Sequence, residues 1–188
     1  CFSDEDISAY GVVVLAAIGR VPNTDADWFR SSGLKLDERG YVTVDGYGRT
    51  NLDGVWALGD ITPGHALAHR AFEQGITIAE KIAGADPKPV LDDTVPQVVF
   101  SFPEAASVGL TLDQAKARED VVEPKETAYP MLSNARMLMS GEGGSMTVVS
   151  GAFANNPDMQ VVLGVHIVSP IASDLIAEAE QLVGNRVP

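Results

Sequence analysis

The chain has 188 residues, 45% of them hydrophobic and 21% charged, so it is long enough to bury a core. Its net charge of −13 argues against a nucleic-acid-binding protein, because such a surface needs clustered lysine and arginine. No run reaches the about 20 apolar residues of a membrane-spanning helix, and the only cysteine, Cys1, excludes an internal disulfide framework. We therefore expect neither a nucleic acid nor a membrane as a partner, and a reducing, cytoplasmic setting.

The first half of the chain has the pattern of an α/β protein. The apolar run of residues 11–18, GVVVLAAI, predicts a strand buried on both faces, as in a parallel sheet. A short helix over residues 25–32 should follow, then an alternating strand over residues 41–44 that ends in an Asp-Gly turn. A second buried strand is expected over residues 55–58.

The longest helix of this half is expected over residues 67–83. Its apolar residues recur every three or four positions and form one stripe, typical of a face that packs on a core: Ala68, Phe72, Ile76, Ala79 and Ala83. Gly84 follows where a helix C-cap glycine is expected. Residues 85–89, with two prolines, form the expected linker to a second domain.

Beyond the linker the pattern becomes that of an α+β domain with a mostly antiparallel sheet. Four strands are expected, over residues 97–102, 105–110, 146–154 and 161–168. Two helices are expected, over residues 111–119 with Thr111 as N-cap, and over residues 173–183. His166 lies in an apolar strand and should be a packed or hydrogen-bonded core residue. The three histidines do not have the spacing of metal ligands.

Gly59 and Asp60 are the first candidates for a ligand site. They follow a predicted strand at its carboxyl end, the edge where open α/β sheets hold their ligands. A carboxylate there suits a hydroxyl-rich ligand, such as the sugar chain of a nucleotide cofactor. The helix start at residues 66–69 offers free N–H groups that favour an anion. From the residues alone, a simple Gly-Asp turn and an ordinary strand-loop-helix connection remain open as alternatives.

Five segments, in order and at matching spacing, resemble the flavoprotein disulfide reductases, the class I pyridine nucleotide-disulfide oxidoreductases. Residues 15–23 are similar to that family's ATGRxPN segment, and residues 50–60 to its T-x5-(Tyr/Trp)-A-x-G-D motif. Residues 67–75, which begin LAHRA, resemble the LAHKA stretch of the dihydrolipoamide dehydrogenases within it. Residues 96–110 resemble the start of its dimerisation domain, and residues 163–170 its LGAHILGP segment.

The resemblance implies three parts: residues 1–18 as the end of an NAD-binding domain, 19–86 as the C-terminal part of an FAD-binding domain, and 92–188 as a truncated dimerisation domain. It also implies FAD and NAD as cofactors, with Asp60 on the ribityl chain of FAD. The residues that would contact the flavin through their backbone are Ala66, Leu67, Ala68 and His69. Gly19 matches a position where the family's backbone contacts NAD.

Several parts of the family's machinery are missing from the chain. It has no pair of redox cysteines, no Gly-rich dinucleotide loop and no His-Pro…Glu acid/base pair, so both cofactor sites are incomplete. It also begins with Cys1 rather than methionine. We therefore expect a C-terminal fragment of a longer enzyme that is inactive alone and supplies no catalytic residue.

The parent enzyme is expected to be a homodimer that works with the components of a 2-oxoacid dehydrogenase complex and contributes to cell redox homeostasis. Two alternatives stay open. The parent could be a related reductase of glutathione-like, mercuric or coenzyme A disulfide substrates, or the chain could be a non-catalytic dimerisation and scaffold module.

Overall fold

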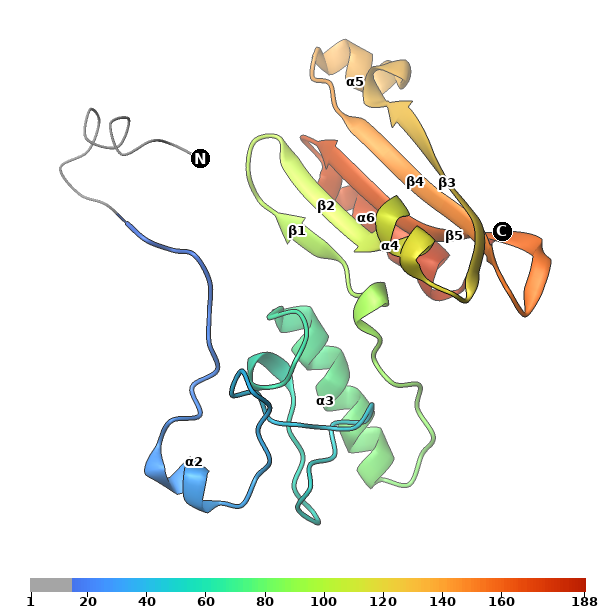
Figure 1. Cartoon of the computed structure of the whole chain (residues 1–188). Helices are drawn as coiled ribbons and strands as arrows, with labels where there is room; N and C mark the ends of the chain where they lie inside the picture. Colours follow the sequence, from blue (N-terminus) through green and yellow to red (C-terminus); the bar gives the residue numbers. More distant parts are fainter. Residues whose placement is uncertain (1–14) are drawn as a thin grey trace.

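The computed structural model describes residues 15–188, which form two parts connected by a short junction (Figure 1). The N-terminal part contains α2 (Asp27–Ser31), η1 (Gly59–Ile61) and α3 (Ala68–Ile82), and the junction contains η2 (Asp92–Thr94). The C-terminal part contains, in chain order, β1 (Gln97–Val99), β2 (Glu104–Gly109), α4 (Leu112–Ala117), β3 (Val121–Pro130), η3 (Met131–Ser133), α5 (Ala135–Ser140), β4 (Ser145–Phe153), β5 (Asn156–Ser169) and α6 (Ala172–Gly184).

The strands predicted for the N-terminal part are wrong in the described residues. The predicted strand over residues 11–18 lies partly outside them, and residues 15–18 are irregular and exposed. Residues 41–44 and 55–58 form only isolated bridges, Leu36 with Val42 and Arg49 with Trp56. A buried strand needs hydrogen-bonded neighbours on both edges, and here each segment has one bridging residue. Residues 55–58 are accordingly half-exposed rather than buried.

Helix α3 is confirmed, but the face it buries is not the predicted one. Phe72 and Ile76 of the predicted apolar stripe are 73% and 52% exposed. The buried residues are instead Arg70, Thr77 and Ile78. Turns of the N-terminal part and the junction pack on that side and leave the apolar stripe uncovered in the described residues. The predicted C-terminus is confirmed, because Gly84 has a φ of +86° and the Ala85 N–H donates to the Glu80 carbonyl.

The C-terminal part confirms the predicted antiparallel α+β fold. Its sheet has the order β1-β2-β5-β4-β3, and every neighbouring pair is antiparallel. Figure 1 shows α6 behind this sheet and α4 in front of it. Helix α6 packs on β2 and β5 through a cluster of small and branched side chains: Ala106, Val108, Val165, Ile167, Ala172, Ile176, Ala179 and Val183.

Local signals explain the ends of these elements. Thr111 caps α4 as predicted, since its side chain accepts from the Gln114 N–H while the Gln114 side chain accepts from the Thr111 N–H. His166 is half-buried and hydrogen-bonded, as expected, with Nδ1 2.6 Å from Ser107 Oγ and Nε2 3.2 Å from the Leu110 carbonyl. The sequence did not indicate β3 or α5. Strand β3 contains two prolines and forms the sheet edge, where a missing N–H is tolerated.

Candidate cofactor site

Gly59 fixes the turn before Asp60 against helix α3. Its φ is +72°, and a Cβ added to it would lie 3.3 Å from the Cβ of Ala71. The Gly59 N–H donates to Gln74 Oε1 at 2.8 Å, and its carbonyl accepts from Thr62 Oγ1 at 2.8 Å. The turn and the first half of α3 therefore form one unit, and Gln74 belongs to the site, although its spacing from Gly59 gave no signal in the sequence.

Asp60 presents its carboxylate to solvent beside this unit. Its side chain is 59% exposed, and Oδ2 lies 3.6 Å from Nη1 of Arg20. An ion pair this long and this exposed contributes little to stability. The carboxylate oxygens thus remain accessible as hydrogen-bond acceptors. Both interpretations of Gly-Asp are compatible with this geometry, because the residues form a turn and also present an acceptor.

The start of α3 is open at the same edge. The helix begins at Ala68, its N-cap is Leu67, no side chain caps it, and its first turn holds no acidic residue. The first N–H groups of a helix have no acceptor inside it, so those at Ala68 and His69 are available to an anion. Ala66 is exposed and small, which permits close approach of a ligand.

Gly19 lies near this edge but not in an enclosed site. A Cβ added to it would meet nothing within 4 Å. Its neighbour Arg20 reaches Asp60, so the structure brings the Gly19 segment and the Gly-Asp turn together. The sequence motifs gave no signal for this contact.

Arg70 replaces the lysine of the LAHKA pattern and is the best-buried charge of the N-terminal part. It is 5% exposed, and its Nε donates to Asp92 Oδ1 at 2.6 Å. Its Nη2 donates to the Pro63 carbonyl at 2.5 Å, while its Nη1 has no hydrogen-bond partner. Gly64, with a φ of +117°, lies directly against the guanidinium, so only glycine fits there. These bonds tie α3 to the junction.

The residues present therefore fit one side of a flavin nucleotide. Asp60 supplies an exposed acceptor, and the uncapped helix start supplies donors for an anionic group. The sequence has neither the Gly-rich loop that would hold a pyrophosphate nor the cysteine pair of a redox disulfide. Within residues 15–188, no group of three histidine, cysteine or acidic residues is placed to bind a metal ion.

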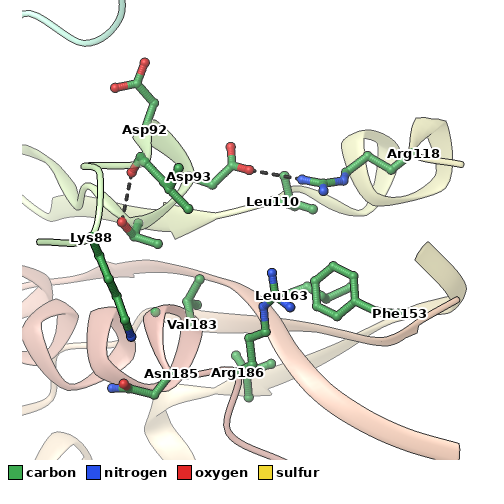
Figure 2. A pocket seen from close by; sticks show the side chains of 14 residues that line it. Lys88, Asp92, Asp93, Leu110, Arg118, Phe153, Leu163, Val183, Asn185 and Arg186 are labelled. Atoms are coloured by element: carbon green, nitrogen blue, oxygen red, sulfur yellow. Dashed lines mark hydrogen bonds and ion pairs between the residues drawn. The ribbon is translucent and has the colours of Figure 1, made fainter. Parts of the chain in front are cut away.

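Two cavities lie away from Asp60, beside the junction. One of about 800 Å³ lies between α3 and the end of α6, and His69, Phe72 and Glu180 are among its lining residues. The other, of about 640 Å³, is shown in Figure 2. There Arg118 bonds to Asp120 at 2.7 Å and to Asp93 at 3.1 Å, and the two bonds raise the pKa of Arg118. The bond from Arg118 lowers the pKa of Asp120.

The pair across the second cavity attaches the junction to the sheet, because Asp93 belongs to η2 and Arg118 follows α4. On the opposite side, the guanidinium of Arg186 lies 4.3 Å from the centre of the Phe153 ring. None of the residues predicted to bind a cofactor lines this cavity.

Among the helices of residues 15–188, none is both long and apolar enough to cross a membrane.

Comparison with known proteins gives the family. Residues 3–75 match the family described as "Pyridine nucleotide-disulphide oxidoreductase", and residues 95–188 match its dimerisation domain. Dihydrolipoyl dehydrogenase of Cupriavidus necator is 40% identical over 183 residues, covering 95% of this chain and 37% of the relative. The enzyme of the same name from Geobacillus stearothermophilus is 41% identical over 167 residues, covering 88% and 34%.

Among solved structures, LpdA from Mycobacterium tuberculosis superposes with a TM-score of 0.79 at 33% identity, over 91% of this chain and 36% of that one. The chain spans about a third of the length of the curated relatives it matches. The matched segments and this superposition confirm the predicted combination of an α/β part and an antiparallel dimerisation domain. The chain belongs to the pyridine nucleotide-disulphide oxidoreductase family.

Proposed function

We propose that these residues are part of an FAD- and NAD-dependent dihydrolipoyl dehydrogenase, which oxidises dihydrolipoamide to lipoamide and reduces NAD+ to NADH. The observation that carries the proposal is the packing of the Gly59-Asp60 turn on α3, beside an uncapped helix start. The names of the relatives support the same activity. We also propose the division into residues 1–18, 19–86 and 92–188 as parts of the NAD-binding, FAD-binding and dimerisation domains.

In this proposal the chain orients and stabilises the flavin. Asp60 would accept hydrogen bonds from the ribityl hydroxyls, and the backbone of residues 66–69 would lie against the ring. The partial positive charge at the start of α3 would favour added negative charge there. Gly19 would contact NAD through its backbone. When bound, FAD would carry the electron pair from the redox cysteine pair, once dihydrolipoamide has reduced it, to NAD+.

We further propose that the complete protein is a cytoplasmic homodimer that serves a 2-oxoacid dehydrogenase complex and cell redox homeostasis. The match to a dimerisation domain supports self-association. So does a set of exposed apolar side chains on β3, η3 and α5: Tyr129, Leu132, Leu138 and Met139. In Figure 1, η3 and α5 lie at the end of the sheet away from the N-terminal part.

A second candidate function is that of a dimerisation and scaffold module. The C-terminal part supports it, because that part has two core clusters of its own and pairs all its strands with one another. Light scattering of the 188-residue chain with and without FAD separates the two functions. A colourless dimer supports the module, whereas retained flavin supports a cofactor site.

The decisive experiment compares substrates. The complete protein should retain FAD and reduce NAD+ with dihydrolipoamide, while the 188-residue chain, lacking the cysteine pair, should show no turnover. Oxidised glutathione, coenzyme A disulfide and mercuric ion are the competing substrates to assay. Preference for one of these would replace the proposed substrate, and a complete protein without flavin would refute the proposed function.

A further inference from the structure

Two histidines beside the start of α3 contact the first residues of the C-terminal part. His69 Nε2 lies 2.7 Å from the Pro96 carbonyl oxygen, and His65 Nε2 lies 3.2 Å from Gln97 Nε2. These contacts join residues 27 and 32 positions apart in the sequence. The start of α3 is thus attached to the segment that enters β1.

The chemistry of these atoms determines which atom donates the hydrogen in each of the two bonds. A carbonyl oxygen can only accept, so His69 Nε2 carries a hydrogen and donates it to Pro96. The amide nitrogen of Gln97 donates to His65 Nε2, which is then the unprotonated nitrogen of that ring. His69 keeps its donor whether its ring is neutral or charged, and a distance of 2.7 Å is short for an N–H···O bond.

The acceptor of this bond is itself held in place. Just before Pro96, Asp92 bonds to Arg70 of α3 at 2.6 Å, and Asp93 bonds to Arg118 beside the sheet at 3.1 Å. Val95, directly before Pro96, is buried. The Pro96 carbonyl therefore belongs to a segment anchored on both parts, and a bond to it fixes the first turn of α3 relative to the sheet.

We propose that His69 is a positioning residue whose bond to the Pro96 carbonyl holds the start of α3 at a fixed place relative to the dimerisation domain. The inference rests on the proposed function, in which the backbone of residues 66–69 lies against the flavin. The His69 side chain points to the junction, so its role is separate from that of its backbone. The bond thereby couples the orientation of the backbone of residues 66–69 to the position of the dimerisation domain.

Hydrogen exchange on the 188-residue chain tests the bond without any cofactor. The Ala71 N–H donates to the Leu67 carbonyl, the first backbone hydrogen bond at the start of α3. In His69→Ala, exchange at residues 71–74 should speed up by about 2- to 10-fold, the worth of one hydrogen bond. Alanine is the better helix former, so a purely local effect would instead slow exchange.

A second experiment measures the flavin midpoint potential and the FAD content of the complete protein and of its His69→Ala, His69→Gln and Glu80→Gln variants. Loosening the start of α3 should weaken stabilisation of the anionic reduced ring, so the midpoint potential of His69→Ala should become more negative while FAD content stays near one per chain. Gln carries an N–H at the same number of bonds from Cα and should restore both readouts. Glu80 is exposed on the last turns of α3 and is the matched control.

Unchanged exchange and potential in His69→Ala, or equal shifts in Glu80→Gln, would overturn the inference. A shift that His69→Gln does not restore would also overturn it, because the lost donor would not be the cause. If the wild-type complete protein holds no FAD, the proposed function fails, while the exchange measurement still decides whether the bond positions α3.

Discussion

The Arg70–Asp92 pair allows the sharpest test of how the N-terminal part is held together. Arg70 is 5% exposed, whereas Asp92 is 41% exposed. Removing one partner of a fully buried pair costs about 3–5 kcal/mol, and an exposed pair contributes about 0–1 kcal/mol. Because Asp92 is half in solvent, we expect Asp92→Ala to cost about 1.5–3 kcal/mol, the range of a hydrogen bond to a charged group.

Part of this cost arises at the guanidinium. Its Nη1 already has no hydrogen-bond partner, and losing Asp92 would leave Nε without one as well. Only the bond from Nη2 to the Pro63 carbonyl would remain. Only one of the three guanidinium nitrogens would then have a hydrogen-bond partner, and the cost of burying the charge would be poorly offset. Water entering from the Asp92 side would limit the loss, which is why the upper range for a buried pair is not expected.

Tryptophan fluorescence during urea unfolding is the assay. Both tryptophans, Trp28 and Trp56, lie in the N-terminal part, so the signal reports on the part that contains Arg70. With a urea slope of about 1–3 kcal/mol per molar, the transition should move down by about 1 M. Asp86→Ala is the matched control, because Asp86 pairs with Lys81 of the same helix but is 92% exposed. Equal midpoints for the two variants would refute the reasoning.

Three further predictions concern the flavin, the pH dependence and the sheet. Asp60→Ala in the complete protein should weaken FAD retention by about 1.5–3 kcal/mol, and unchanged flavin content after gel filtration at low protein concentration would contradict its role. The pKa of Glu104 lies below its ordinary 4.5, chiefly because the carboxylate accepts the backbone N–H at the start of α6. The contribution of Glu104 to folding stability is therefore complete above pH 4.5 and is lost as the pH falls through the lowered pKa. In a plot of urea midpoint against pH, Glu104→Gln should flatten the acid side. Gly109→Ala should prevent folding of the C-terminal part, seen as lost chemical-shift dispersion, because φ is +80° and a Cβ would overlap the Leu163 carbonyl. Gly141→Ala, with a φ of +70° and open space around it, should cost only about 1–2 kcal/mol, and equal damage from both would show that the overlap is unimportant.

The C-terminal part could be predicted well because its signals are local. The apolar strand around His166, the Thr111 cap and the apolar face of α6 all agree with the positions that the structure gives them. Strand β3 could not be predicted, since its prolines and charges hide the pattern of an edge strand that is held by one neighbour. Its existence depends on pairing with β4, the next strand along the chain, from which η3 and α5 separate it.

The N-terminal part shows the opposite case. The apolar runs of residues 15–18 and 55–58 are typical of buried strands, but burial depends on neighbours that residues 15–188 do not supply. The same holds for the exposed stripe of Phe72 and Ile76 on α3. The Gly-Asp turn and the helix start were found from their motifs, whereas Gln74 and the Arg70–Asp92 bond required the three-dimensional packing.

The opposite orientation of the consecutive residues Asp92 and Asp93 has a consequence for where this chain can change in length. Asp92 bonds to an arginine of the N-terminal part and Asp93 to one of the C-terminal part. Asp92 and Asp93 lie in the 3-10 turn η2, where consecutive side chains point about 120° apart. Inserting or deleting a single residue there would turn both carboxylates away from their arginines, and both ion pairs would be lost together. Residues 85–89, which are irregular, should accept such changes freely. The number of residues is therefore constrained at the junction, while the neighbouring linker tolerates insertions and deletions.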